Sequence, residues 1–213
     1  MNQLDLLASR IVATRAEKSA EQAILVGVSG IDASGKGFIT SKVAERLRAQ
    51  QVNVAAICVD GWLNLPHQRF NPDNLAEDFY EHALRFEEMF AQLILPLRDN
   101  RTITLDADHT EETASSYRKR RHEYRDIDVV LLEGIFLLKP AHRHHFDLTV
   151  WVDCSFETAL ERAIKRGQEG LPANETIKAF ETIYFPAQRI HFARDNPQAA
   201  ADLIVHNGAF YDA

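Results

Sequence analysis

The stretch Val26-Gly27-Val28-Ser29-Gly30-Ile31-Asp32-Ala33-Ser34-Gly35-Lys36 joins an apolar run to a glycine-rich turn. The run begins at Ala23 and is apolar almost throughout, as expected of a strand that is covered on both faces of a parallel sheet. After the turn, apolar residues recur at every fourth position, at Ile39, Val43 and Leu47, and this spacing predicts a helix with one buried face. We therefore expect a buried strand, a tight turn and a helix in direct succession.

The turn fits the pattern G-x-x-x-x-G-K from Gly30 to Lys36. Glycines permit a tight loop whose backbone N–H groups point inward, and the following helix presents its positive end. In such a phosphate-binding loop the lysine reaches the β- and γ-phosphates of a nucleotide. The residues expected to contact the nucleotide are Gly30, Ile31, Asp32, Ala33, Ser34, Gly35, Lys36, Gly37 and Phe38. The alternative is a glycine-rich turn that binds no ligand.

The residue after the lysine departs from the usual motif, in which Ser or Thr supplies a hydroxyl to Mg²⁺. Gly37 has no side chain that could coordinate a metal. Because Mg²⁺ commonly keeps several waters, a water could take the place of the hydroxyl. Losing one preorganised electrostatic contact typically costs on the order of 10²–10³ in rate. A weakened or catalytically inactive protein is therefore the alternative to a full enzyme.

Apolar strands and amphipathic helices alternate along the rest of the chain. Further strands are predicted at 52–59, 129–132, 148–152 and 203–205, with a short peripheral strand at 102–105 that leads into a polar loop. Helices are predicted at 3–18, from Asn71-Pro72 to about Leu95, after Asp153 with Phe156, Leu160 and Ile164 inward, and at about 175–193. This order predicts an α/β fold, a three-layer α/β/α sandwich with a parallel central sheet. The length of 213 residues fits a single domain over 1–213, with residues 1–20 as an N-terminal helical segment.

Three of the predicted strands end at an acidic residue: Asp60, Glu133 and Asp153. Ligands of parallel α/β sheets bind beyond the carboxyl ends of the strands. Phosphoryl transfer to a hydroxyl needs a carboxylate that orients or deprotonates the acceptor, together with acids that hold Mg²⁺. We expect the strand before Asp60 to neighbour the phosphate-binding loop. Alone, each acid fits a helix cap or a solvated strand end; together with the loop, Asp60 and Glu133 indicate a site.

Composition excludes several classes of protein. The formal net charge of −7 argues against a duplex-binding protein that relies on global positive charge. The basic run at 118–121 is offset by nearby acids and is interpreted as an exposed loop. No apolar stretch approaches the ~18 residues of a membrane span, and no signal peptide is evident. Cys58 and Cys154 lie in apolar stretches and are interpreted as core residues of a cytoplasmic protein. A homo-oligomer is left open.

Five segments, taken in order, resemble the uridine kinase and phosphoribulokinase group of P-loop kinases. They are Gly30 to Lys36, Val59-Asp60-Gly61-Trp62, Asp128-Val129-Val130-Leu131-Leu132-Glu133-Gly134-Ile135, Phe146-Asp147-Leu148-Thr149-Val150-Trp151-Val152-Asp153 and Ala201-Asp202-Leu203-Ile204-Val205. The first segment is common to many NTP-binding proteins, whereas the ordered set is more specific. The resemblance covers most of residues 22–207 and implies ATP-dependent phosphorylation of a small-molecule hydroxyl with Mg²⁺.

The resemblance also implies roles for individual residues. Asp60 matches the catalytic aspartate and is a second candidate ligand of Mg²⁺, while Glu133 matches the acid near the metal. Lys36 would act on the transferring phosphate. The segment at about 160–175 matches the lid, where Arg162 and Arg166 lie on one helical face and would close over the phosphates. Solvated helix charges are the alternative for these two arginines.

The acceptor is less defined. Uridine kinases usually show a Pro-x-Tyr-Asp segment with a downstream His, and the corresponding stretch here, Thr104-Leu105-Asp106-Ala107-Asp108-His109, lacks the tyrosine. Asp78 is a candidate for binding acceptor hydroxyls, and Trp62 for walling the pocket. The acceptor therefore stays open between nucleoside-like and sugar-like molecules. A regulatory module that binds a nucleotide without turnover is the alternative function, motivated by Gly37 and the few lid arginines.

Overall fold

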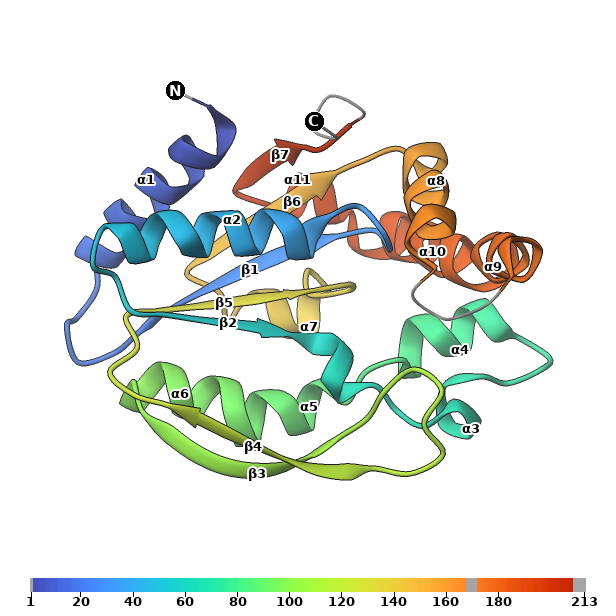
Figure 1. Cartoon of the computed structure of the whole chain (residues 1–213), viewed down its shortest axis with the longest axis horizontal. Helices are drawn as coiled ribbons and strands as arrows, with labels where there is room; N and C mark the ends of the chain where they lie inside the picture. The colour runs from blue at the N-terminus through green and yellow to red at the C-terminus, as the bar shows by residue number, and fades with distance from the viewer. Residues whose placement is uncertain (1, 168–171, 209–213) are drawn as a thin grey trace.

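A parallel sheet of five strands forms the centre of the protein in a computed structural model that describes residues 2–167 and 172–208 (Figure 1). The strand order is β2-β5-β1-β6-β7. These strands are β1 (Ile24–Gly30), β2 (Val54–Cys58), β5 (Val129–Gly134), β6 (Leu148–Asp153) and β7 (Leu203–His206). The prediction of a parallel central sheet is confirmed.

Helices cover both faces of this sheet, so the molecule has three layers (Figure 1). On one face, α1 (Gln3–Ala16) and α2 (Lys36–Ala49) pack on alternate residues of the strands, among them Val26 and Val150. The other face packs Leu25 and Val130 against the segments between β2 and β3. These segments are α3 (Pro66–Arg69), α4 (Leu75–His82), α5 (Phe86–Met89), a π-helical turn at Phe90–Ile94 and α6 (Leu95–Asn100). Because both faces are covered, the central strands are apolar throughout.

The strand β2 differs from the prediction in two ways. It lies at the edge of the sheet, with β5 between it and β1, so the strand before Asp60 does not neighbour the phosphate-binding loop. It is also only partly buried, since Ala56 and Cys58 are exposed. The interpretation of Cys58 as a core residue was therefore wrong, because one face of an edge strand opens towards a cavity instead of a helix layer.

The long helix predicted from Asn71 to Leu95 is interrupted. The first helical segment, α4, starts after Asn74, and the chain leaves the helical path before α5. At the break, the Asn64 N–H donates to the Ala83 carbonyl at 2.9 Å, and the Arg85 N–H donates to the Trp62 carbonyl at 2.9 Å. Pairing with the segment after β2 thus replaces the helical hydrogen bonds, a long-range effect that periodicity does not encode.

A second sheet stands where the sequence predicted mainly loop. The strands β3 (Ile103–His109) and β4 (Arg118–Tyr124) form an antiparallel pair. Opposite charges on their outer face pair across the strands, with 2.9 Å from Lys119 to Asp108 and 3.7 Å from Arg121 to Asp106. Cross-strand ion pairs stabilise such a ribbon. The basic run was taken for a loop because its strand pattern is made of charges instead of apolar residues.

The remaining helices are α7 (Pro140–Arg143), α8 (Phe156–Arg166), α9 (Ala173–Ala179), a π-helical turn at Phe180–Tyr184, α10 (Phe185–Asp195) and α11 (Pro197–Ala200). Of these, α8 and α9 lie beyond the carboxyl end of the sheet (Figure 1), whereas α7 packs on α5 through His142 and Phe86. Ala159 and Ala163 form the buried face of α8, whereas Ile164, predicted to point inward, is exposed. Residues 168–171 of the predicted lid lie outside the described residues. None of the helices described is long and apolar enough to cross a membrane.

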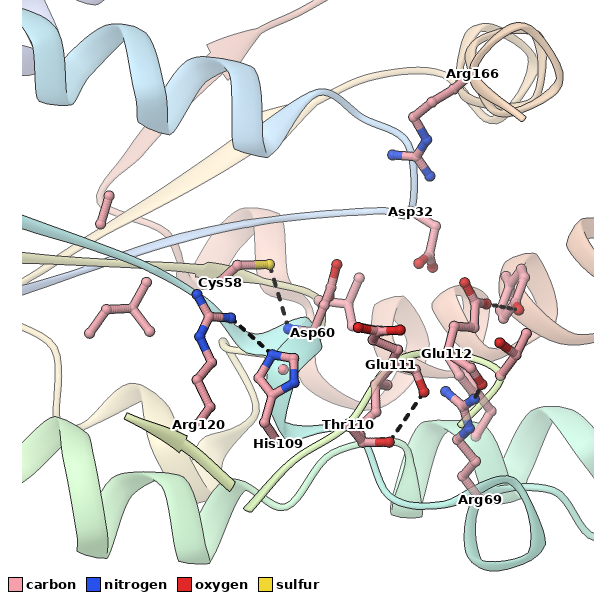
Figure 2. Close-up of a pocket in the computed structure, with 18 of the residues that line it drawn as sticks. Asp32, Cys58, Asp60, Arg69, His109, Thr110, Glu111, Glu112, Arg120 and Arg166 are labelled. Carbon is pink, nitrogen blue, oxygen red and sulfur yellow. Dashed lines mark hydrogen bonds between the residues drawn. The ribbon is translucent and has the colours of Figure 1, made fainter. Parts of the chain in front are cut away.

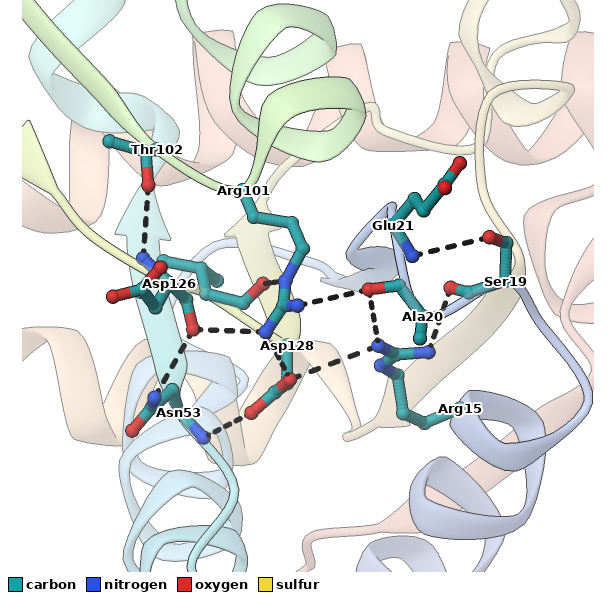
Figure 3. A network of polar contacts seen from close by, with 10 residues as sticks. Arg15, Ser19, Ala20, Glu21, Asn53, Arg101, Thr102, Asp126 and Asp128 are labelled. Atoms are coloured by element: carbon teal, nitrogen blue, oxygen red, sulfur yellow. Dashed lines mark hydrogen bonds and ion pairs between the residues drawn. The ribbon is translucent and has the colours of Figure 1, made fainter.

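A polar network closes the opposite end of the sheet, where β2 and β5 begin (Figure 3). The Arg101 guanidinium donates to Asp128 Oδ1 at 2.7 Å and to the Ile127 carbonyl at 2.9 Å. The backbone N–H of Asn53 donates to Asp128 Oδ2 at 2.9 Å, and Arg15 of α1 approaches the same carboxylate at 3.8 Å. Asp128 therefore joins four segments of the chain far from the candidate site.

Candidate active site

The loop between β1 and α2 has the backbone conformation that its glycines predict. Ala33 and Gly35 have φ of 57° and 86°, in the left-handed region. A Cβ on Gly30 would stand 2.6 Å from Ser34 Oγ, and a Cβ on Gly35 would overlap the side-chain amide of Asn207. Only glycine fits either position. The N-cap Gly35 offers no side chain to the first N–H groups of α2, which leaves them available to an anion.

Two side chains hold this loop from behind, and both donate to the Ser34 carbonyl. Asn207, just after β7, donates its side-chain N–H at 2.7 Å. Arg162 of α8 donates to the same carbonyl at 3.3 Å, to the Asn207 carbonyl at 2.9 Å and to the Gly208 carbonyl at 3.3 Å. In the structure, Arg162 thus stabilises the conformation of the loop through hydrogen bonds to backbone carbonyls.

Asp32 belongs to the loop between β1 and α2, and its side chain contacts α10. Gln188 of α10 donates to its Oδ2 at 2.9 Å. Burial raises the pKa of Asp32, while the positive charge of Lys36 acts in the opposite direction. Arg166 of α8 extends towards Asp32 across the opening (Figure 2). The carboxylate of Asp32 thus lies close to two cationic side chains, those of Lys36 and Arg166.

Glu133 comes to the loop from β5, the strand next to β1, where it pairs in register with Val28. Its Oε1 lies 3.5 Å from the point at which a Cβ on Gly37 would stand. Burial raises the pKa of Glu133, and the charge of Lys36 opposes this effect. The carboxylate thus faces the loop at the position where the usual motif places its hydroxyl.

Asp60 lies beyond the end of β2, in a short 3₁₀ turn (Val59–Trp62). Its backbone N–H donates to the Cys58 sulfur at 3.5 Å. The Cys58 thiol in turn hydrogen-bonds Glu133, with which it pairs in register. Desolvation by surrounding protein atoms, together with the charges of Asp60 and Glu133, raises the pKa of this thiol. The contacts of Cys58 thus connect the two acids that were predicted on separate strands.

Two cavities open at this end of the sheet, and both are lined by Asp60 and Arg166. The first, called the nucleotide-side cavity because it borders the loop predicted to bind a nucleotide, has a volume of about 540 Å³. It is further lined by Ala33, Gly35, Lys36, Gly37, Phe38, Glu133, Arg162 and Lys165. The second, called the acceptor-side cavity because it lies beyond the predicted catalytic Asp60, has a volume of about 590 Å³ (Figure 2). Its further polar lining comes from Asp32, Arg69, His109, Thr110, Glu111, Glu112, Thr113, Arg120, His122, Tyr124 and Tyr184.

Most residues predicted for the site lie around these cavities. Five line neither of them: Gly30, Ile31 and Ser34 of the loop, Trp62 and Asp78. Trp62 is only 2% exposed, lies among the core residues and has the Arg85 guanidinium over its ring. Its indole therefore does not wall the pocket. Asp78 in α4 lines neither cavity, although Phe79 of the same helix lines the acceptor-side cavity.

Several lining residues had no signal that the sequence analysis used. Arg69 is 2% exposed and donates to the Glu112 carbonyl, while the Tyr184 hydroxyl donates to Glu112 Oε1 at 2.7 Å. His109 and Arg120 come from β3 and β4. Alternation of Arg118, Arg120, His122 and Tyr124 on one face of β4 could have indicated them, had the segment been recognised as a strand.

Comparisons with known proteins agree with this architecture. A uridine kinase from Limosilactobacillus reuteri is 29% identical over 190 residues, covering 87% of this chain and 84% of that protein. A uridine kinase from Macrococcus caseolyticus is 26% identical over 190 residues, covering 86% of this chain and 88% of the relative. No protein-family model matches the chain.

Among solved structures, a possible uridine kinase from Bacillus stearothermophilus superposes with a TM-score of 0.71 at 22% identity. The match covers 94% of this chain and 96% of that one, and shows that the two share the fold of P-loop kinases. The named relatives support a phosphotransferase. The resemblance of this chain to the uridine kinase-like P-loop kinases is thereby confirmed over most of its length.

Proposed function

We propose that this protein is a kinase that transfers the γ-phosphoryl group of ATP to a hydroxyl of a small nucleoside-like or sugar-like molecule. The observation that carries the proposal is that Asp60 and Arg166 line both cavities. A group transferred between two substrates must pass the place where their binding sites meet. One acid and one cation at that junction are the side chains that phosphoryl transfer needs.

The nucleotide side fits a polyphosphate. The uncapped N–H groups of α2 and the side chain of Lys36 are donors for phosphate oxygens. Mg²⁺ fits here as well, because it is usually held by one or two carboxylates together with substrate phosphates. Glu133 and Asp60 both line this cavity and would hold it. When bound, Mg²⁺ would neutralise charge on the phosphates.

The acceptor side fits the second substrate. A cavity of about 590 Å³ is in the range of ~300–1,000 Å³ typical of small-molecule sites. An acceptor hydroxyl beside Asp60 would attack the γ-phosphorus as its O–H proton passes to the carboxylate. The new O–P bond forms as the bond from the γ-phosphorus to the β,γ-bridging oxygen breaks, and ADP leaves with that oxygen. Arg166 would stabilise the negative charge on the transferring group.

A panel of nucleosides, free sugars and polyols tests the proposal through ADP release and the mass of the phosphorylated product. We expect one acceptor class to stimulate ADP release above the ATP-only rate. The variant Asp60→Asn should lose this stimulation while its affinity for ATP without Mg²⁺ stays unchanged, because the carboxylate acts on the acceptor and on the metal. Acceptor-stimulated turnover retained in Asp60→Asn would remove Asp60 from this role.

The second candidate is a module that binds the nucleotide without turnover, and Gly37 favours it. Without the motif hydroxyl, the side chains that offer a metal ligand on the nucleotide side are Glu133 and Asp60, among the residues the structure describes. This candidate predicts saturable ATP binding with no ADP release for any acceptor. The panel separates the two candidates.

A further inference from the structure

The acceptor-side cavity has a basic corner, formed by Arg120, His109 and His122. Ala56 and Ile57 of β2 line the same cavity. In Figure 2, Arg120 and His109 lie on one side of Asp60. A molecule whose hydroxyl reaches Asp60 therefore has its other end within reach of the basic corner.

Arg120 differs from its neighbours in β4 by its partner. Arg118 pairs with Glu111, Lys119 with Asp108, and Arg121 with Asp106. Arg120 has no carboxylate at ion-pair distance among residues 2–167 and 172–208, and its guanidinium donates to His109 Nε2 at 2.9 Å instead. A guanidinium always carries its charge, so the corner holds a positive charge that no carboxylate of the described residues pairs with.

The hydrogen bond fixes the state of His109. Because arginine only donates, His109 Nε2 must accept, and the neutral ring carries its proton on Nδ1. Burial lowers the pKa of His109, and the charges of Arg120 and Arg118 lower it further. Gly61 makes room for the ring, since a Cβ there would stand 2.7 Å from two of its atoms. His109 thus orients Arg120 without compensating its charge.

At the opposite end of the cavity, both acidic and basic side chains are present. There, Arg69 donates to the Glu112 carbonyl, the Glu112 carboxylate accepts from Tyr184, and Glu111 pairs with Arg118. Figure 2 shows Arg69, Glu111 and Glu112 on the other side of Asp60 from Arg120. Acidic and basic side chains therefore occur together at that end, whereas Arg120 at the other end pairs with no carboxylate among the described residues.

We propose that the acceptor carries an anionic group, a carboxylate or a phosphate, which binds Arg120 at the basic corner while its hydroxyl lies at Asp60. This inference rests on the kinase function proposed above and narrows its substrate class to hydroxy acids or sugar phosphates. A carboxylate is planar and a phosphate is tetrahedral. A guanidinium binds the oxygens of both groups with charge-assisted hydrogen bonds. An uncharged nucleoside would leave Arg120 without an anionic partner.

Matched pairs of acceptors test the proposal: D-glycerate with glycerol, D-gluconate with D-glucitol, and D-ribose 5-phosphate with D-ribose. We expect the anionic member of at least one pair to have a kcat/KM roughly 10- to 100-fold higher, the range of a hydrogen bond to a charged group. The first two pairs report carboxylate and the third reports phosphate. Uncharged members that react as well as anionic ones would overturn the proposal.

Arg120→Gln should remove this preference, mainly by raising the KM of the anionic member of each pair. Arg121→Gln is the matched control, because Arg121 lies next in the same strand and faces outward to Asp106. Equal effects of the two variants on the preference would contradict a role for the basic corner. A preference for uncharged acceptors that still depends on Asp60 would refute the anionic group and leave the kinase function intact.

Binding provides a readout that does not depend on turnover. With the phosphate-binding loop saturated by the β,γ-imido analogue of ATP, calorimetry with D-glycerate, D-gluconate and D-ribose 5-phosphate measures the second site alone. We expect at least one of them to bind the unmodified protein. Its affinity for Arg120→Gln should be lower by a factor of roughly ten or more. If no acceptor stimulates ADP release, the kinase function fails. If none of these anions binds in an Arg120-dependent way, the proposed anion-binding role of the basic corner is wrong, whatever the outcome for the kinase function.

Discussion

The Glu133 carboxylate faces Gly37 across the start of α2, with Oε1 3.5 Å from the point where a Cβ on Gly37 would stand. That distance is ordinary van der Waals contact, so a small side chain fits. Position 37 is also where related loops supply a hydroxyl to Mg²⁺. The chain therefore retains the space beside the acid but lacks the oxygen.

Gly37→Ser should strengthen Mg²⁺ binding. The new hydroxyl would stand beside Glu133 and the phosphates, where one preorganised ligand is worth roughly tenfold or more. A Mg²⁺ titration of nucleotide binding should show half-saturation at about one tenth of the original metal concentration. Gly37→Ala adds the Cβ without the oxygen and should leave the titration unchanged. An equal improvement in both variants would show that helix propensity, and not metal ligation, is responsible.

Glu133→Gln should raise stability at neutral and alkaline pH while it weakens Mg²⁺-dependent nucleotide binding. Burial raises the pKa of Glu133 above its ordinary value of 4.5, so the folded state binds this proton more tightly than the unfolded state does. The stability that Glu133 contributes is then complete below about pH 4.5 and is lost as the pH rises through the raised pKa. The neutral amide avoids this loss.

Thermal unfolding of the two proteins between about pH 4 and 8 measures the effect. The Tm of Glu133→Gln should exceed that of the unmodified protein at the alkaline end, and the difference should shrink as the pH falls. Such a gain in stability on removal of a functional acid is common at active sites. A lower Tm of the variant at every pH would mean that the carboxylate stabilises the fold.

The sequence predicted the central sheet and the loop because both depend on local patterns. Buried parallel strands read as continuous apolar runs, and Gly30 and Gly35 are required by close contacts within the loop and with Asn207. The positions of Glu133 and Lys36 could be predicted because one ends an apolar strand and the other ends the loop. What failed was strand order: the position of β2 at the edge depends on which strands pair, and no local pattern specifies it.

The acceptor side was mostly missed for a related reason. Trp62 and Asp78 were chosen by residue type, yet Trp62 packs in the core and Asp78 lines neither cavity. His109 and Arg120 reach the cavity only because β3 and β4 pair, and their strands are stabilised by charges that resemble a solvated loop in sequence. Cavities built from long-range pairing of polar segments are poorly marked by periodicity.

Gly61→Ala should weaken acceptor binding without affecting the nucleotide. The Cβ would stand 2.7 Å from His109 Cδ2 and Nε2, so the ring must move and its hydrogen bond to Arg120 must break. We expect the KM of the acceptor to rise several-fold while the affinity for ATP is retained. In a His109→Ala background the ring is absent, so adding Gly61→Ala should cost nothing more. Additive effects of the two changes would place the role of Gly61 elsewhere.

Asp128→Ala should destabilise the fold and spare the site. The change removes one acceptor of the Arg101 guanidinium, in a partly buried hydrogen bond, and a lost partner of such a donor costs about 1–3 kcal/mol. It also removes the acceptor of the exposed Asn53 N–H. Asp99→Ala is the control, since Asp99 is an exposed partner of Arg98 and such pairs contribute about 0–1 kcal/mol. Urea unfolding should show the larger loss for Asp128→Ala, with ATP affinity below the transition equal in both variants. A loss no greater than that of Asp99→Ala would mean that water replaces the network at no cost.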